Sequence, residues 1–166
     1  MKRSTLRLAL VFGFPLFSLS SAFAQVAPQE PASFYTVAEY GVDRDPAEDL
    51  KATVERAQAE GKRILIQVGG DWCGWCKLLD GYIHDHSSIS EKIEAGFLIM
   101  KVTYDSKNRN EAFLGQYPRI QGYPHLYVLE KDGTLLYSKN TVELEEGRSY
   151  NEQAILEFLD EWMAEG

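Results

Sequence analysis

Cysteine and positive charge are both scarce in this sequence. Its 166 residues include only two cysteines, Cys73 and Cys76, which excludes the framework of several disulfides that small secreted domains use. Lysine and arginine number 17 against 25 acidic residues, and the net charge of −8 argues against nucleic acid or an anionic membrane as a partner. The length suits one domain. A content of 45% hydrophobic and 25% charged residues is typical of a globular protein and excludes a disordered or low-complexity chain.

Long hydrophobic runs are also missing, apart from one near the start. Three basic residues precede an apolar run over residues 8–19, and Ala22 and Ala24 then match a small-residue cleavage site. We therefore expect residues 1–24 to be a signal peptide, with a retained amphipathic anchor as the alternative. The run is shorter than the roughly 20 residues of a membrane span. The pattern predicts an exported protein, periplasmic or secreted, whose mature chain does not insert into a membrane.

The rest of the sequence predicts alternating helices and strands. Residues 25–45 contain proline and are expected to form an irregular N-terminal extension, and the domain is expected over residues 46–166. Helices are predicted from Asp45-Pro46 to Gly61, around Leu79 and Ile83, from a capping box at Ser88–Glu91, over Asn110–Tyr117, and from a capping box at Ser149–Glu152. Strands are predicted over residues 63–68, 97–104, 126–129 and 134–137. This order predicts an α/β fold in which helices cover both faces of a mixed sheet.

The two cysteines form a Cys-x-x-Cys pair that follows a predicted buried strand and opens a helix. Residues three positions apart lie on the same face of a helix, so the two sulfurs can close a small ring. The unpaired N–H groups at the helix start favour a thiolate and lower the pKa of the Cys73 thiol. Cys73 is therefore predicted to be the attacking thiolate, and Cys76, one turn deeper, the resolving thiol.

Two motifs resemble those of the thioredoxin superfamily, and the resemblance covers residues 62–165. The sequence Trp-Cys-Gly-Trp-Cys-Lys at residues 72–77 is similar to the family's active-site motif, and Gly-Tyr-Pro at residues 122–124 is similar to its cis-proline loop. The resemblance implies a thioredoxin-like fold and thiol–disulfide oxidoreductase activity, with the cysteine pair as a redox-active disulfide and no bound organic cofactor. It also implies that Pro124 is cis and that Tyr123 pairs with the main chain of an extended substrate.

The sequence departs from thioredoxins in the groups that handle protons. Gln67 stands six residues before Cys73, where thioredoxins carry a buried acid, so the proton of Cys76 must pass to water or to another group. His125 is a candidate because imidazole titrates near neutral pH, and a packing or surface histidine is the alternative. Lys77 is a candidate for adding positive potential near the pair, or is simply a solvated side chain.

The remaining features suggest what the pair acts on. Trp72 and Trp75 are candidates for binding a partner protein, and ordinary packing is the alternative for Trp75. The Gly-Trp dipeptide and the predicted signal peptide resemble small exported bacterial thioredoxin-like proteins. The interval from Lys77 to Gly122 has no room for the helical insertion of dedicated oxidases, which favours a reductase or general exchange protein. The expected partners of this monomer are protein thiols and disulfides and an upstream redox partner such as a membrane thiol-reductant donor.

Two other classes of function remain open from the sequence. Cys73, Cys76, His84 and His86 could supply sulfur and imidazole ligands to copper or zinc, as in a metallochaperone. Alternatively, the fold could act only as an interaction module, with the acidic stretch Glu143–Glu146 as a docking surface or merely a solvated loop.

Overall fold

The computed structural model describes residues 33–163. The predicted signal peptide, residues 1–24, and the first part of the predicted extension lie outside the described residues. Within residues 33–163, no helix has both the length and the apolar character needed to span a bilayer.

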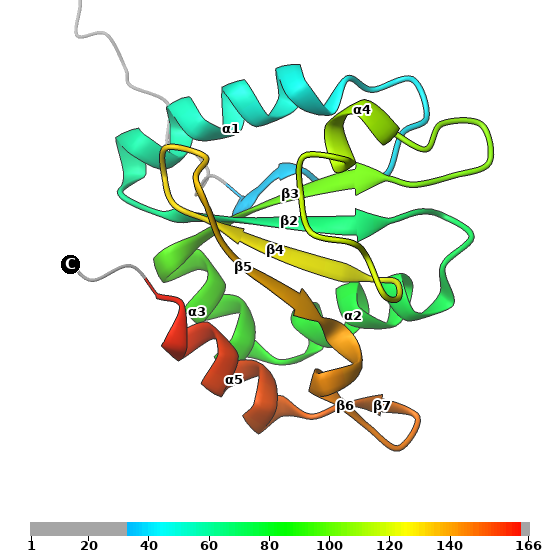
Figure 1. Cartoon of the computed structure of the whole chain (residues 1–166). Helices are drawn as coiled ribbons and strands as arrows, with labels where there is room; N and C mark the ends of the chain where they lie inside the picture. Colours follow the sequence, from blue (N-terminus) through cyan, green and yellow to red (C-terminus); the bar gives the residue numbers. More distant parts are fainter. Residues whose placement is uncertain (1–32, 164–166) are drawn as a thin grey trace, which may run out of the picture. The chain divides into compact units, whose positions relative to one another are not determined.

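A mixed five-stranded sheet forms the centre of the domain, with the strand order β1-β3-β2-β4-β5 (Figure 1). Its strands are β1 (Tyr35–Val37), β2 (Arg63–Gly69), β3 (Phe97–Thr103), β4 (His125–Leu129) and β5 (Leu135–Asn140). β1 and β2 both run parallel to β3, whereas β4 runs antiparallel to β2 and to β5. The predicted mixed sheet is confirmed, and β4 and β5 form an antiparallel hairpin at one edge of it.

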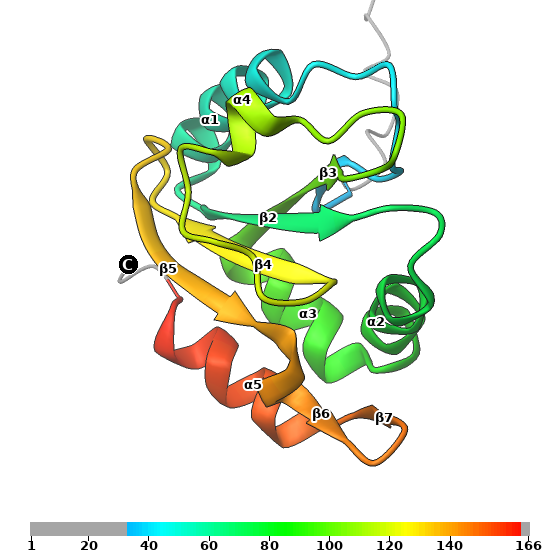
Figure 2. The same cartoon turned by 45° about the vertical axis from the view of Figure 1, so that its right-hand side comes forward.

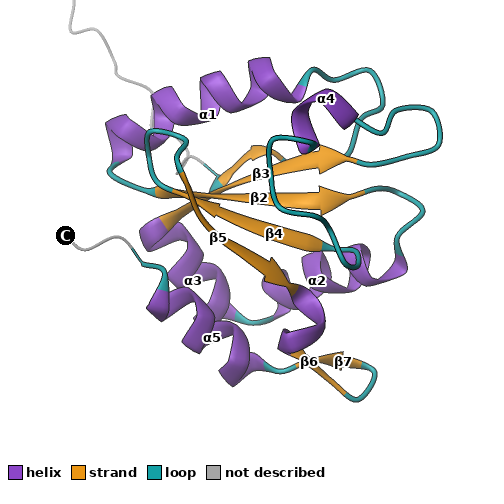
Figure 3. Cartoon of the chain, viewed as in Figure 1, coloured by secondary structure: helices purple, strands orange, loops and turns teal. Residues whose placement is uncertain are grey.

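Helices cover both faces of the sheet, as predicted (Figure 3). One face carries α1 (Pro46–Glu60) and the short α4 (Glu111–Leu114); the other carries α2 (Gly74–Asp85), α3 (Ser87–Gly96) and α5 (Glu152–Glu161). Between β5 and α5 the chain forms a 3-10 turn, η1 (Thr141–Leu144), and a two-stranded hairpin of β6 (Glu145–Glu146) and β7 (Ser149–Tyr150), which lies near α2 (Figure 2).

The central strands are buried on both sides because alternate residues serve two cores. Leu65 and Ile99 belong to the core under α2, α3 and α5, whereas Ile64 and Leu98 belong to the core under α1 and α4. This double burial explains why β2 and β3 are nearly continuous apolar runs rather than alternating ones.

The ends of α1 follow the predicted signals. Asp45 caps the helix with its Oδ1 accepting the N–H of Ala47 at 2.9 Å, and Pro46 occupies the first helical position. Gly61 ends the helix in the left-handed conformation with φ +68°, where a side chain would be strained.

The predicted irregular extension was wrong over Tyr35–Val37, which forms the edge strand β1. Three residues are too few to show an alternating pattern, and the strand is fixed instead by pairing with β3, where the Ile99 N–H donates to the Phe34 carbonyl at 2.8 Å. The sheet therefore begins within the stretch predicted as an extension.

Both predicted capping boxes were wrong in detail, although the helices behind them exist. His86 precedes α3 without a side-chain cap, and the Ser88 hydroxyl donates to Glu152 across the α3–α5 contact. Asn151 rather than Ser149 caps α5, with Oδ1 accepting the Ala154 N–H at 2.9 Å.

The helix predicted over Asn110–Tyr117 is also shorter than expected. Its regular part, α4, covers only Glu111–Leu114, and from Gly115 onward the chain continues in turns. Beyond Leu114 the backbone bonds tighten to the i→i−3 type, from Gln116 to Phe113 at 3.2 Å and from Tyr117 to Leu114 at 3.1 Å, and Pro118 then excludes a further helical turn.

Candidate active site

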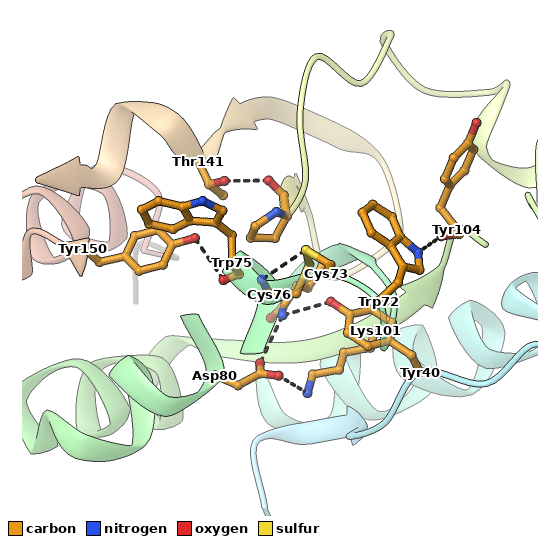
Figure 4. Close-up of a disulfide and its surroundings, with 12 residues drawn as sticks. Tyr40, Trp72, Cys73, Trp75, Cys76, Asp80, Lys101, Tyr104, Thr141 and Tyr150 are labelled. Atoms are coloured by element: carbon orange, nitrogen blue, oxygen red, sulfur yellow. Dashed lines mark hydrogen bonds and ion pairs between the residues drawn. A yellow bond between two sulfur atoms is a disulfide. The ribbon is translucent and has the colours of Figure 1, made fainter. Parts of the chain in front are cut away.

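The two cysteines lie at the N-terminal end of α2, which follows β2 in the chain. They are joined by a disulfide, and Cys73 is the N-cap residue of the helix, with its Sγ accepting the backbone N–H of Cys76 at 3.1 Å (Figure 4). Cys73 is 3% exposed and Cys76 is fully buried, so Cys76 is the more shielded of the two. The predicted placement of the pair, after a buried strand and at a helix start, is confirmed.

Glycine is required beneath the disulfide at the end of β2. A Cβ at Gly69 would fall 2.4 Å from the Cys76 Sγ and 2.7 Å from the Tyr40 hydroxyl oxygen. The sulfur therefore lies directly against the strand backbone, in space that only glycine leaves open.

An aromatic cluster lies on one side of the disulfide. Trp72 is 54% exposed, and its Nε1–H donates to the Tyr104 carbonyl at 2.7 Å. The Trp72 ring meets the Tyr123 ring edge-to-face at 5.5 Å, and Tyr123 stacks on Tyr104 at 5.0 Å. These contacts bring the Gly-Tyr-Pro loop next to the cysteine motif.

The proline of this loop has the expected configuration. The Tyr123–Pro124 peptide bond is cis, and Pro124 is buried immediately before β4. Its carbonyl accepts a hydrogen bond from the Thr141 hydroxyl at 2.5 Å, which ties the loop to η1. Figure 4 shows Thr141 on the side of the disulfide opposite Asp80.

Trp75 lies on the other side of the disulfide from Trp72 (Figure 4). It is half-buried, and its ring meets that of Tyr150 edge-to-face at 5.5 Å. The Tyr150 hydroxyl donates to the Trp75 carbonyl at 3.3 Å, so the β7 end of the hairpin supports the start of α2. Trp75 is packed against the domain, which agrees with the alternative of ordinary packing.

A polar network that the sequence analysis missed lies beneath the disulfide. Gln67, which is 1% exposed, donates from Nε2 to the Tyr40 hydroxyl oxygen at 3.1 Å and to the Asp80 Oδ1 at 3.0 Å. The other Asp80 oxygen pairs with the Lys101 Nζ at 2.7 Å. One signal could have found Asp80, because it stands four residues after Cys76 and so shares its helix face. Tyr40 and Lys101 are too distant in sequence to give such a signal.

The structure does not bring His125 to this network. Its neighbour on β4, Leu126, belongs to the same core as Leu65 and α2, so His125 itself points to the opposite face with Tyr127, 4.7 Å away ring to ring. Its Nε2 lies 2.9 Å from the Ser138 hydroxyl, and burial lowers the pKa of His125 to about 4. The expectation that His125 takes the Cys76 proton is corrected: it is a packing histidine.

The possible metal ligands are not brought together. His84 and His86 lie at the far end of α2 from the cysteines; along the helix axis His84 is about 12 Å from Cys76 and about 16 Å from Cys73. Within residues 33–163, no three His, Cys, Asp or Glu side chains are grouped as a metal site.

The other charged candidates lie at the surface. Lys77 is exposed and forms no ion pair with any residue in the described part of the chain. In the acidic stretch, Glu143 pairs with Lys139 at 2.7 Å and Glu146 accepts from the Asn151 side chain at 3.1 Å, so part of its charge is already engaged.

Sequence relatives were found among proteins of thiol chemistry. The chain is 28% identical over 119 residues to the thiol:disulfide interchange protein DsbD of Pseudomonas sp. (strain JR1 / K1), which covers 71% of this chain and 19% of that protein. It is 27% identical over 92 residues to the protein of the same name from Pseudomonas fluorescens, covering 55% of this chain and 15% of that one. The chain thus spans less than a fifth of the length of these relatives.

Solved structures share the fold. A disulphide isomerase from Xylella fastidiosa Temecula1 has a TM-score of 0.63 and 25% identity, over 74% of this chain and 94% of that one. The oxidised C-terminal domain of Neisseria meningitidis DsbD has a TM-score of 0.53 and 17% identity, over 74% of this chain and 99% of that one, a likeness of fold alone. The model of a family described as thioredoxin-like matches residues 45–131, more than half of the chain. With this match and the disulfide at the start of α2, the chain belongs to the thioredoxin-like family.

Proposed function

We propose that the chain is a thiol–disulfide oxidoreductase that exchanges disulfides with protein substrates through Cys73 and Cys76. The observation that carries this proposal is the disulfide at the N-terminus of α2, where the Cys73 sulfur already accepts a backbone N–H. In the reduced pair, the same N–H and the helix dipole would favour the Cys73 thiolate. The relatives named as thiol:disulfide interchange proteins and as a disulphide isomerase support this chemistry.

The exchange proceeds in two displacements. The Cys73 thiolate attacks one sulfur of a substrate disulfide; the substrate S–S bond breaks, and its electron pair leaves with the second substrate sulfur. Cys76 then attacks the Cys73 sulfur and breaks the mixed disulfide. The first substrate sulfur leaves as a thiolate. The two substrate thiolates together take up two protons, which equal the one that Cys76 gives up to solvent and the one that Cys73 lost when it formed its thiolate. The substrate is reduced by two electrons and the pair is oxidised.

Substrate binding is assigned to the surface around the Gly-Tyr-Pro loop. Trp72 is exposed and rests on Tyr123, and both lie beside the motif that contains the disulfide. The backbone at Tyr123 and Pro124 leads directly into β4, so an extended substrate segment could pair with it as an added strand. Lys77, exposed at the first turn of α2, would add positive potential near Cys73.

The proposed direction is reduction or general exchange in an exported protein. Between Lys77 and Gly122 the chain forms only α2, α3, β3 and α4, which supports a reductase over an oxidase with a helical insertion. Export rests on the signal-like residues 1–24, and the name of the Pseudomonas relatives agrees with a redox partner that supplies or accepts electrons. The disulfide itself is the proposed redox centre, without an organic cofactor.

Trapping of mixed disulfides tests this proposal. The variant Cys76→Ser should accumulate a mixed disulfide with a protein substrate, because Cys73 can attack but nothing releases it, whereas Cys73→Ser should not. The wild-type chain should reduce a protein disulfide when a dithiol is supplied, and its reduction potential should be that of a reductant or general exchanger rather than a strong oxidant. Equal trapping by both variants, or no reduction by the wild type, would contradict the proposal.

A further inference from the structure

Tyr40 lies close to the buried sulfur, although it belongs to the segment that precedes the thioredoxin-like match. The Cys76 Sγ and the Tyr40 hydroxyl oxygen lie 2.4 Å and 2.7 Å from the same point, the place of an ideal Cβ at Gly69. The two atoms can therefore be no farther apart than the sum of these distances. Both border the space that Gly69 leaves open, and Figure 4 shows Tyr40 on the same side of the disulfide as Asp80 and Lys101.

In the hydrogen bonds around Tyr40, Gln67 is the donor, and Tyr40 and Asp80 are the acceptors. Asp80, paired with Lys101, can only accept, so Gln67 presents its amide nitrogen there. The same nitrogen donates its second hydrogen to the Tyr40 oxygen. The Tyr40 hydroxyl therefore acts as an acceptor toward Gln67, and within residues 33–163 it donates its own hydrogen in no hydrogen bond. Donation from Gln67 strengthens the Tyr40 hydroxyl as a donor.

The ring of Tyr40 is held in place from two directions. The next residue, Gly41, donates its N–H to the Thr103 hydroxyl oxygen at 2.8 Å, and the same hydroxyl donates to the Gly41 carbonyl at 3.0 Å. The Lys101 Nζ lies 5.4 Å from the centre of the Tyr40 ring. Burial raises the pKa of Tyr40 above its usual value, so the hydroxyl keeps its proton across the neutral range.

We propose that Tyr40 takes part in the second displacement, donating a hydrogen bond from its hydroxyl to the Cys76 sulfur once the disulfide is open. This inference rests on the proposed oxidoreductase function. In that step the Cys76 sulfur bonds to the Cys73 sulfur, the bond from Cys73 to the substrate breaks, and its electron pair stays with the substrate sulfur. The hydrogen bond favours the thiolate of a cysteine that is fully buried and would otherwise hold its proton.

The variant Tyr40→Phe removes only the hydroxyl and should slow this step. A tenfold loss of Cys76 thiolate is offset in part, because a more basic sulfur is a better nucleophile, and the net rate falls about threefold. Loss of a hydrogen bond to a charged sulfur can lower the thiolate fraction of Cys76 by one to two powers of ten. We therefore expect the second displacement to be about three to ten times slower at neutral pH.

The test is a stopped-flow reaction of the reduced full-length chain with 5,5′-dithiobis(2-nitrobenzoate). Attack by Cys73 releases a first thionitrobenzoate, and closure of the disulfide by Cys76 releases a second. In Tyr40→Phe the first phase should keep its rate, whereas the second should slow and its pH midpoint should rise. Tyr137→Phe, at a 38% exposed tyrosine on β5, is the matched control and should leave both phases unchanged. Gln67→Met should slow the second phase by less, because the Tyr40 hydroxyl stays but loses its donor.

An unchanged second phase in Tyr40→Phe would overturn the role of Tyr40. So would a slowing that is equal at every pH, or equal in both phases, since either result indicates a structural effect. If the wild-type chain itself released no second thionitrobenzoate, the proposed exchange would fail instead, which separates the two hypotheses. A urea unfolding curve for each variant shows that the compared chains are folded.

Discussion

The Cys76 sulfur lies directly over the backbone of Gly69, at the point where a side chain there would begin. The Sγ is 2.4 Å from the ideal Cβ position, closer than any two such atoms can approach. β2 and α2 are therefore in contact at the disulfide itself. This contact fixes how deep the second cysteine lies.

The first prediction concerns this contact. Gly69→Ala should lower the free energy of unfolding by about 1–3 kcal/mol, because the new methyl group forces Cys76 and Tyr40 to move. Gly81→Ala is the matched control: it lies inside α2, a Cβ there meets nothing within 4 Å, and it should stabilise the protein by about 0.5–1 kcal/mol. Urea denaturation of the oxidised proteins measures both. A Gly69→Ala protein as stable as the wild type would contradict the close packing.

Much of the fold could be predicted because it follows local signals. The Asp45 cap with Pro46, the apolar runs of β2 and β3, and the Asp-Gly turn before β5 each leave a mark on adjacent residues. β1 could not be predicted, since a three-residue edge strand is defined by its partner strand. The first capping box was wrong because the Ser88 hydroxyl bonds to Glu152 on another helix, and the second because Asn151, two residues after Ser149, caps α5 instead.

The second prediction separates the two tryptophans of the motif. Trp72→Ala should lower kcat/KM for a protein disulfide about fivefold or more, as expected when an exposed aromatic anchor is lost. Its free energy of unfolding should fall by less than that of Trp75→Ala, because the Trp72 side chain is 54% exposed and loses only its edge contact with Tyr123 and one surface hydrogen bond to Tyr104. Trp75→Ala should instead destabilise the fold by about 1–3 kcal/mol, because the Trp75 ring packs on Tyr150. The reverse pattern in insulin reduction and urea unfolding would overturn the assignment.

The third prediction concerns the ion pair beneath the disulfide. Lys101→Met should lower the free energy of unfolding by about 2 kcal/mol, because it leaves the partly buried carboxylate of Asp80 without its cation. Lys77→Met, at an exposed position, is the control and should change stability little. In an Asp80→Asn background, Lys101→Met should lower the free energy of unfolding by less than it does in the wild type. Equal losses in both backgrounds would show that the pair is not coupled.

The fourth prediction is a pH dependence set by His125. Burial lowers its pKa from 6.5 to about 4, so between these values the unfolded chain binds a proton that the folded chain does not. The contribution of His125 to the free energy of unfolding is therefore complete above about pH 6.5. It falls by about 3 kcal/mol in total as the pH drops toward 4. His125→Gln should flatten this part of the stability curve, whereas His84→Gln, at an exposed histidine, should not. If His125→Gln left the pH dependence of the free energy of unfolding unchanged, the lowered pKa of His125 would be refuted.

The candidate site was predictable only where its residues are neighbours in sequence. Cys73, Cys76 and Trp72 share one motif, and the Gly-Tyr-Pro loop is a second short motif. The network of Tyr40, Gln67, Asp80 and Lys101 joins the loop after β1 to β2, α2 and β3, so only the folded domain brings these side chains together. His125 was misassigned because its place next to Pro124 gives proximity along the chain, while strand alternation turns its side chain to the other face.

The reactivity of Cys73 as a function of pH tests the central claim most directly. The rate of alkylation of Cys73 by iodoacetamide, measured in the reduced Cys76→Ser variant, reports the fraction of thiolate at the start of α2. A thiolate stabilised by the helix N-terminus predicts a midpoint below about pH 8.5, the value of an unperturbed cysteine thiol. A midpoint above about pH 9 would mean that Cys73 is protonated at neutral pH, and would contradict its role as the attacking sulfur.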